Sequence, residues 1–557
     1  MKEGFRQSMA WLHTWSGLLV GWVLFMVFAA GTASYFKDEI TFWMKPELHA
    51  VAQNAVPPVK AVESAVAYLQ QRAADSPRWF INLPNERQPS TDVLYLAPPA
   101  PAGAAAATGA KPGEKPRRRF DRASLDPATG EAVSAPRVTR GGEFFYRLHF
   151  DLHYMPALWA RWIVGFCAMF MLVAIFSGIV THKRIFKDFF TFRPKKGQRS
   201  WLDAHNVTAV LALPYHLMIT YTGLVTLMFM YMPWGPQVAY KDRGGEQAFF
   251  SEAFPGGGRD QIKASGNRVL LAPIAPMMAQ ASAHWGGAAV GRVTVHQPND
   301  ANAVVSLTRA EGPQLSYDQP SMQFNGATGA LIGAFGDVPK PAAETRGVLY
   351  GLHIGRFGDP LLRALFFLSG LAGCLMVATG LLMWAVKERQ KFAKTLKQGG
   401  RISFGLRLVD GLNLGAIAGL PVAMAAFFWA NRLLPVDVAE RGEAEIRWFF
   451  IVWGATAVLG LLRPTLRMWQ AQLALGALLF AGLPVLNALT GPAPLTVSLR
   501  SGPTSVAGFD LVVIALGLGL AGAAWIVERK RRKSIAKQAA AKTQPPPSTL
   551  ATSGQGS

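Results

Sequence analysis

Cysteine is almost absent from this sequence, with only Cys167 and Cys374 among 557 residues. Both lie within apolar stretches, so the chain has no disulfide framework, no CxxCH motif for covalent haem attachment, and no cysteine set for zinc or an iron–sulfur cluster. Any bound metal must therefore be held by histidine or carboxylate side chains. Acidic residues are also scarce, 34 against 56 Lys and Arg, which leaves a formal net charge of +22.

The basic residues lie mostly beside long apolar runs, and this distribution argues against nucleic-acid binding. Eight runs are long enough, at about 1.5 Å per residue, to cross a hydrocarbon layer of about 30 Å. These runs are residues 15–33, 157–181, 206–233, 361–386, 411–434, 447–462, 469–490 and 508–527. The sequence therefore predicts a polytopic α-helical membrane protein with about eight transmembrane helices and the lipid bilayer as a partner.

Loops rich in Lys and Arg follow the second and fourth runs, and the tail after the eighth run is basic as well. By the positive-inside rule these segments are cytoplasmic, so both termini are expected on the inner side of a bacterial inner membrane. The acidic loop from Asp437 to Glu445 then falls on the opposite side. Residues 1–34 resemble a cleavable signal, but the polar residues around His13 match a later span, which favours a retained first span.

Two long segments separate the first four spans, and each is predicted to form a periplasmic α+β domain inserted between helices 1 and 2 or helices 3 and 4. The stretches LDPATGEAVS (125–134) and FNGATGALIG (324–333) both predict a hairpin, residues 59–73 predict a helix, and residues 98–119 predict a flexible loop. The expected plan is a first span over 1–35, a domain over 36–148, two spans with a basic cytoplasmic loop over 149–233, a second domain over 234–352, a fourth span over 353–390, a C-terminal four-helix region over 391–528, and a basic disordered cytoplasmic tail over 529–557.

The spans repeat as well as the domains. His13 precedes Gly31 by 18 positions, and His205 precedes Gly223 by the same number. The stretch FYRLHFDLH (145–153) likewise matches LYGLHIG (349–355). A helix–domain–helix unit has been used twice, and such parallel repeats assemble around a pseudo-two-fold axis along the membrane normal.

Seven of the ten histidines lie in or against the first four spans: His13, His149, His153, His182, His205, His216 and His353. A single histidine near a membrane interface is more often structural than functional. The pseudo-two-fold, however, places His13 opposite His205 at the cytoplasmic face and His149 opposite His353 at the external face. Two facing imidazoles are what a six-coordinate haem iron requires, so these four residues are the predicted iron ligands of two b-type haems.

The other three histidines leave the assignment open. His182 shares the depth of the inner pair and His153 stands one helical turn from His149, so both compete as ligands. His216 lies near mid-membrane, where it either ligates or bridges haem or is hydrogen-bonded to Tyr215, Thr220 or a neighbouring helix. The arginines that could meet haem propionates outside are Arg147, Arg161, Arg356 and Arg363.

Two other kinds of site were weighed against haem. Zinc is the chemical rival, because His ligates it readily. Such a site requires three or four converging ligands and a nearby carboxylate general base, and Asp151 and Asp203 are near enough to keep this alternative open. A GxGxxG string at Gly517, Gly519 and Gly522 lies inside the eighth span with no preceding strand, so helix packing explains it better than a dinucleotide fold.

Five stretches carry most of the histidines of the first four spans and their surroundings: LHTWSG (12–17), LHFDLH (148–153), DAHNV with LPYHLMITYTG (203–223), LHIGRFG (352–358) and VATGLLMW (377–384). These stretches resemble the PepSY-associated transmembrane proteins, and among these the iron-regulated ferric-siderophore reductases. The resemblance covers residues 1 to about 390 with moderately specific motifs. It implies PepSY-like periplasmic domains, haem between helices, and electron delivery from the cytoplasm to periplasmic ferric siderophore. The fused flavin reductase domain of other members is missing, so the cytoplasmic donor is expected to be a separate flavin or reductase.

The expected function is that of an oxidoreductase in iron homeostasis: a two-haem cytochrome that reduces siderophore-bound Fe(III) to Fe(II). Two alternatives from other classes remain. One is a non-redox envelope sensor or peptide-binding protein of the PepSY type, and the other is a transporter for iron or siderophore. Haem content distinguishes the first reading from both alternatives.

Overall fold

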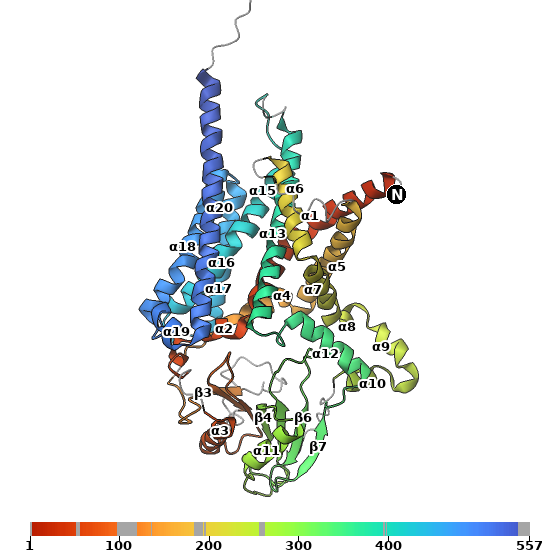
Figure 1. The fold of residues 1–557 in the computed structure, drawn as a ribbon, viewed down its shortest axis with the longest axis vertical. Coiled ribbons are helices and arrows are strands. Elements are labelled where there is room, and N and C mark those ends of the chain that lie inside the picture. Colours follow the sequence, from red (N-terminus) through yellow and green to blue (C-terminus); the bar gives the residue numbers. More distant parts are fainter. Residues whose placement is uncertain are drawn as a thin grey trace, which may run out of the picture.

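The apolar runs form long helices, and a β-sheet domain lies at one end of them (Figure 1). The computed structural model describes residues 3–51, 56–96, 120–134, 136–182, 193, 196–254, 262–393, 396 and 398–543. The predicted flexible loop at 98–119 lies outside these residues, as do most of the basic loop after the second span and the last part of the tail.

Within the described residues, seven helical stretches are long and apolar enough to cross a membrane. They are α1 (Glu3–Ser34), α5 (Ala157–Thr181), α13 (Pro360–Lys391), the continuous stretch Phe404–Leu433, α17 (Arg441–Leu462), α18 (Leu466–Thr490) and α20 (Thr504–Thr543). The stretch Phe404–Leu433 consists of α15 (Phe404–Asn413), a π-helical segment η5 (Leu414–Gly419) and α16 (Leu420–Leu433). These helices confirm a multi-pass membrane protein.

The third predicted span differs from the sequence expectation. Helices α6 (Gln198–Leu211) and α7 (Leu213–Thr226) meet at an angle of 68°, and they provide the eighth crossing only if the bent pair spans as one. The break at Ala212 lies two residues before Pro214, which has no N–H to donate and whose ring crowds the preceding turn. Periodicity and hydropathy do not report such a bend, so the sequence predicted one straight helix.

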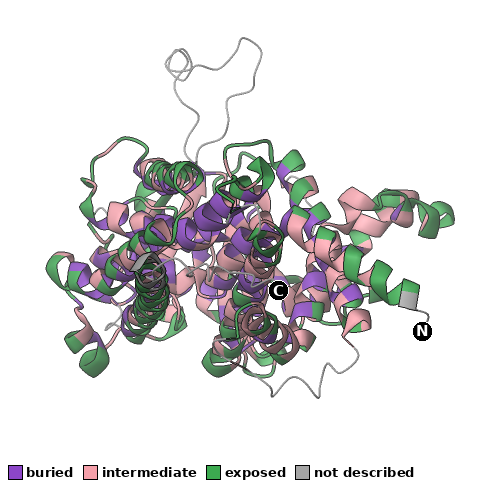
Figure 2. Cartoon of the chain, turned by 90° about the horizontal axis from the view of Figure 1, so that it is seen from above, coloured by how far each residue is buried: buried purple, intermediate pink, exposed green. Residues whose placement is uncertain are grey.

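Viewed along the helices, buried residues lie where helices face one another and exposed residues surround them (Figure 2). Many exposed side chains on the long helices are large and apolar, including Leu19, Phe166, Leu368 and Leu478. Such surfaces suit lipid rather than water.

The two inserted segments form one sheet rather than two separate domains. Its strands are β1 (Arg78–Asn82), β2 (Thr91–Leu96), β3 (Phe120–Leu125), β4 (Val290–His296), β5 (Val304–Arg309), β6 (Ser321–Asn325) and β7 (Leu331–Phe335), in the order β3-β2-β1-β4-β5-β6-β7. Strand β1 pairs antiparallel with β4, and α3 (Pro58–Arg72) and α11 (Ile274–His284) share one hydrophobic core beneath the sheet. Each repeat alone would leave a strand edge unpaired, and joining the repeats satisfies both edges.

The internal duplication extends to individual turns. The carboxylate of Asp126 accepts the N–H of Ala128 (2.8 Å), and the side-chain oxygen of Asn325 accepts the N–H of Ala327 (2.9 Å). Both turns close on a glycine at positive φ, +74° at Gly130 and +78° at Gly329. The second predicted hairpin is β6–β7, whereas the first is reduced to one bridge between residues 125 and 132.

Shorter helices connect the sheet domain to the spans. They are α2 (Lys37–Trp43), η1 (Pro46–Leu48), α4 (Gly141–Asp151), α8 (Met228–Tyr231), α9 (Trp234–Ala239), η4 (Lys241–Arg243), α10 (Gly245–Ala253) and α12 (Pro341–Ile354), whereas the short helix α19 (Leu495–Ser501) joins α18 to α20. Two of them carry candidate ligands. Helix α4, which leads into α5, carries His149, and α12, which leads into α13, carries His353.

The basic tail is not disordered from residue 529 as predicted. Helix α20 continues to Thr543, well beyond the other helices (Figure 1). The segment is rich in Ala, Lys, Arg and Gln, which favour helix, and Glu528 pairs with Arg531 and Arg532 at helical spacing. Residues 544–557 lie outside the described part of the chain.

Candidate functional site

His13 on α1 and His205 on α6 face each other, with ring centroids 6.1 Å apart and ring planes at 70°. The Nδ1 of His13 lies 2.8 Å from the carbonyl oxygen of Ala174, and that of His205 lies 2.9 Å from the carbonyl oxygen of Met376. A carbonyl only accepts, so each Nδ1 carries the hydrogen. Each neutral ring therefore keeps the lone pair of Nε2 for another partner.

His149 on α4 and His353 on α12 form a second pair, with centroids 6.0 Å apart and ring planes at 40°. The Nδ1–H of His149 donates to the carbonyl of Val27 (2.7 Å). The Nδ1 of His353 lies 3.0 Å from the hydroxyl oxygen of Thr222. That hydroxyl already donates to the carbonyl of Met218, so it accepts from His353. In the second pair, as in the first, Nδ1 of each ring donates its hydrogen and the lone pair of Nε2 is left for another partner.

Each of the four imidazoles packs against a glycine on a neighbouring helix. The distance from the imidazole Cε1 to the place where a glycine Cβ would stand is 3.1 Å for His13 and Gly178, 3.2 Å for His205 and Gly380, 2.7 Å for His149 and Gly31, and 3.0 Å for His353 and Gly223. A methyl group at any of these positions would press on the ring. The sequence marked Gly31 and Gly223 only as signs of a repeat, and the contacts of all four glycines with the histidines were missed.

The glycines also explain how the rings reach their carbonyl partners. At three of the four contacts the accepting carbonyl lies four residues before the glycine: Ala174 before Gly178, Met376 before Gly380, and Val27 before Gly31. A side chain at position i+4 of a helix lies over the carbonyl at position i, so the absence of Cβ uncovers it. The uncovered carbonyl fixes the tautomer and the orientation of each ring.

The dimensions of both pairs fit a bis-histidine metal. Imidazole nitrogen lies about 2.0–2.1 Å from a bound metal and about 1.1 Å from its own ring centroid, so two ligands on opposite sides of one metal place their centroids roughly 6.3 Å apart. The observed separations are 6.1 Å and 6.0 Å. The residues present therefore fit an iron held between two Nε2 atoms at each pair.

Two competing histidines are directed elsewhere. His182 follows the end of α5, and its Nε2 accepts a hydrogen bond from the side-chain amide of Asn206 (2.9 Å). The ring of His153 is stacked on Phe450 of α17, with centroids 5.7 Å apart and planes at 14°. Its Nε2 lies 3.4 Å from a carboxylate oxygen of Glu443. Neither residue joins a facing pair.

His216 is buried on α7 with only 1% of its surface exposed. Neither ring nitrogen has a hydrogen-bond partner among the described residues, so the predicted bonds to Tyr215 and Thr220 are not formed. Thr220 instead donates to the backbone carbonyl of His216 (2.7 Å), and the edge of Phe28 contacts the ring at 5.9 Å. An unsatisfied buried polar group costs about 1–3 kcal/mol, which marks His216 as a functional suspect.

The zinc alternative finds no ligand set in the described part of the chain. No group of three or more His, Cys, Asp or Glu side chains there is arranged to hold a metal ion. Asp151 is paired with Arg147 (2.9 Å) and Arg161 (2.8 Å), and Asp203 is paired with Arg193 (2.9 Å). Both carboxylates are therefore committed to arginines.

All four arginines expected near the outer pair have carboxylate partners. These partners are Asp38 and Glu311 for Arg356, Glu39 for Arg363, and Asp151 for Arg147 and Arg161. Anionic propionates at this face would therefore compete with protein carboxylates for the same cations.

A family model described as the PepSY-associated TM region matches residues 10–387. The chain belongs to the PepSY-associated transmembrane family. The match confirms the resemblance seen in the motifs, and it contains all four paired histidines and their glycines. The uncharacterized protein PA4219 of Pseudomonas aeruginosa is 26% identical over 385 residues, which cover 66% of this chain and 91% of that protein.

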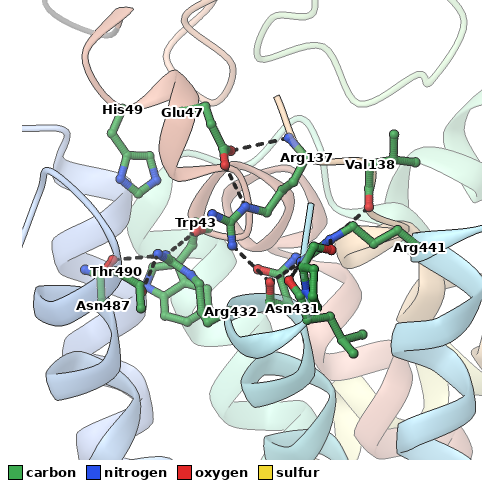
Figure 3. Close-up of polar contacts among 12 residues, drawn as sticks. Trp43, Glu47, His49, Arg137, Val138, Asn431, Arg432, Arg441, Asn487 and Thr490 are labelled. Atoms are coloured by element: carbon green, nitrogen blue, oxygen red, sulfur yellow. Dashed lines mark hydrogen bonds and ion pairs between the residues drawn. The ribbon is translucent and has the colours of Figure 1, made fainter. Parts of the chain in front are cut away.

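The C-terminal helices lie beyond the PepSY-associated region and attach to it through buried polar groups (Figure 3). Arg432 donates to the carbonyl of Trp43 (2.6 Å) and to the side chain of Asn487 (2.9 Å). Trp43 in turn donates through its indole N–H to Asp510 (2.9 Å). A charged side chain buried in a membrane protein costs free energy unless it is paired, and Arg432 finds its partners only when the C-terminal helices pack against α2. These contacts therefore fix how the C-terminal helices pack.

A second buried group continues this contact region. Arg441 and Glu445 form an ion pair whose side chains are 1% and 0% exposed, and the amide of Asn431 donates to Glu445 (2.8 Å). Arg137 pairs with Glu47 (2.7 Å) and donates to the carbonyl of Asn431 (3.0 Å). The sequence placed Glu445 in an exposed acidic loop, and this was wrong because Arg441 lies four residues earlier on the same helix and neutralises it.

Substitution of Glu445 by Gln is expected to lower the free energy of unfolding by about 3–5 kcal/mol, because Arg441 would remain buried without its counter-charge. Chemical or thermal unfolding of the detergent-solubilised protein measures the change. The control is Glu440→Gln, which removes an exposed carboxylate 3.7 Å from Arg447 and should change stability by less than about 1 kcal/mol. Equal small losses in both variants would contradict the role of the buried pair.

Stability is expected to fall as the pH drops from about 7 to 5, in part because of His49. Burial and the nearby Arg432 guanidinium lower the pKa of His49 to about 4 from the ordinary 6.5. Between these values the unfolded chain binds the proton and the folded chain does not, so folding loses roughly 2 kcal/mol by pH 5. Unfolding measured at both pH values tests this. The variant His49→Gln should flatten the difference, and an unchanged slope would exclude His49 as its source.

Proposed function

We propose that this chain is a b-type cytochrome of the inner membrane, with both termini cytoplasmic, that carries electrons outward through two haems to ferric siderophore. The observation that carries the proposal is the two pairs of facing imidazoles, with ring centroids 6.1 Å apart in one pair and 6.0 Å apart in the other. In each ring the lone pair of Nε2 is left for another partner. A sensor or a transporter has no need for two such matched pairs.

The residues of the chain have separate tasks in this proposal. His13 and His205 hold the inner iron, and His149 and His353 hold the outer iron. Bound haem supplies one-electron chemistry, with a potential set by its axial ligands, burial and hydrogen bonds. The carbonyls behind the rings keep Nδ1 protonated and aim Nε2, while the four glycines give the rings room. His216 lies eleven residues after His205 in the sequence and is a candidate for contact with either haem.

The acceptor is inferred from iron chemistry and from the family resemblance. Hydroxamate and catecholate oxygens are hard donors that prefer Fe(III) to Fe(II). One added electron therefore loosens a complex that is otherwise hard to open, and the chelator is released intact. The electron donor is proposed to be a cytoplasmic flavin or a separate reductase.

Purified protein in detergent tests the proposal. A reduced-minus-oxidised visible spectrum and a pyridine haemochrome assay should show low-spin b haem at about two per chain. Addition of a ferric hydroxamate to the chemically reduced protein should then reoxidise the haem and release Fe(II) to a colour-forming chelator. A colourless protein would exclude the cytochrome, and haem that stays reduced would exclude this acceptor.

A further inference from the structure

The turn between α4 and α5 has an unusual backbone. Three consecutive non-glycine residues have positive φ: 53° at Leu152, 53° at His153 and 38° at Tyr154. This region of φ costs of order 1–3 kcal/mol per residue and persists only where surrounding contacts impose it. The turn begins three residues after His149, so it lies beside the outer histidine pair.

The contacts of this turn converge on one carboxylate of α17. His153 Nε2 lies 3.4 Å from Glu443 Oε1, and the Tyr154 hydroxyl donates to the same oxygen at 2.7 Å. Phe450 and Phe144 hold the His153 ring from two sides, with centroids at 5.7 Å and 5.9 Å. The strained backbone therefore brings an imidazole and a phenol onto Glu443.

The site is open to solvent. The side chains of His153 and Glu443 are 24% and 27% exposed. Tyr154 and Glu443 line a hollow of about 500 Å³, whose other lining residues are Arg447, Phe450 and Ile451. A small ion can therefore reach the two donor atoms from outside the protein.

The distance between the donor atoms, 3.4 Å, is at the long end for a hydrogen bond and also suits two ligands of one cation. Good N–H···O bonds are about 2.7–3.2 Å long, shorter than the 3.4 Å found here. Imidazole nitrogen and carboxylate oxygen each lie about 2.0–2.2 Å from a transition metal, which places neighbouring ligands of one ion about 3.0–3.4 Å apart. Imidazole and carboxylate are also common ligands for divalent first-row metals.

We propose that His153 and Glu443 form a weak transition-metal site, with Tyr154 as a positioning residue, and that this site receives iron(II) set free beside the outer histidine pair. The identity of the ion rests on the proposed function, whereas the metal site does not. Haem held by His149 and His353 would supply the electron that reduces Fe(III) to Fe(II); the bonds from iron to the chelator oxygens break, and bonds from iron(II) to Nε2 and Oε1 form.

Two neighbouring groups set the strength of this site. The Tyr154 hydroxyl donates to Glu443 Oε1 at 2.7 Å, so this phenol orients the carboxylate. The guanidinium of Arg447 lines the same hollow and opposes a cation. Binding is therefore weak and reversible, as suits an ion in transit.

Titration of the full-length protein with Co²⁺, which the haem does not reduce, tests the site by calorimetry. The expected result is one weakly bound ion per chain, with affinity reduced at least about tenfold in His153→Asn and Glu443→Gln, and about tenfold in Tyr154→Phe, as for residues that orient ligands. The matched control is His284→Asn, because His284 forms another His–carboxylate contact, 3.0 Å from Asp337, and its loss should leave binding unchanged.

Absence of Co²⁺ binding, or equal binding in wild type and all variants, would overturn the proposal. Tyr154→Phe preserves the ring and guards against loss of fold as the cause. The visible spectrum of each variant is recorded in parallel, so a missing haem, which would contradict the proposed function, is distinguished from a missing metal site.

Discussion

Replacement of His13 or His205 by Ala is expected to remove one of two haems per chain and to leave the other in place. The two rings are the inner pair, 6.1 Å apart, and no other described histidine faces them. With one of the two ligands gone, a haem at this pair would keep only the other histidine, lose its low-spin bis-histidine state and be held too weakly to stay through purification. The pyridine haemochrome assay should fall from about two haems per chain to about one, with the same spectral loss in either variant.

A further histidine serves as the control for this result. His182→Asn alters a residue whose Nε2 accepts a hydrogen bond from Asn206, outside both pairs. This variant should retain two haems. Retention of both haems in the His13 and His205 variants, or loss of a haem in the His182 variant, would refute the ligand assignment.

The sequence predicted the spans and the facing histidines because both depend on local rules. A hydrocarbon layer requires long apolar helices, and a duplicated unit requires a pseudo-two-fold. From these rules alone His13 was paired with His205 and His149 with His353, and the structure brings both pairs together. Their role as ligands remains a prediction.

The features that sequence missed depend on contacts between distant segments. Pairing of β1 with β4 joins residues more than 200 positions apart, which no local pattern reports. The direction of His153 is set by the left-handed backbone of its turn and by Phe450 on α17. The burial of Glu445 could not be predicted, because a segment that contains both Arg441 and Glu445 has the charge pattern of a solvated loop.

The positions of the two pairs along α1 bear on the direction of electron flow. His13 and Gly31 both lie on α1, 18 residues apart, and Gly31 contacts His149. At about 1.5 Å per residue, the two pairs are therefore separated by about 27 Å along this helix. This spacing covers most of a hydrocarbon layer of about 30 Å. The outer pair therefore lies near the sheet domain, where α4 and α12 enter the helices, and a substrate docked there would meet the outer haem first.

Substitution of Gly31 by Ala is expected to remove the outer haem although it replaces none of the proposed ligands. The new Cβ would stand 2.7 Å from both Cε1 and Nδ1 of His149, far inside a normal contact of about 3.5–4.0 Å. The ring could move only by giving up its 2.7 Å hydrogen bond to Val27, which fixes the direction of Nε2. Haem content should fall from about two towards one per chain, with the spectrum of the inner haem unchanged.

The matched control lies on the same helix. Gly17 has nothing within 4 Å of its Cβ position, so Gly17→Ala introduces the same methyl group and the same gain in helix propensity, up to about 1 kcal/mol, without touching a histidine. This variant should keep two haems and be at least as stable as the wild type. If Gly31→Ala also kept two haems, His149 would not depend on the uncovered Val27 carbonyl, and the glycines would serve helix packing alone.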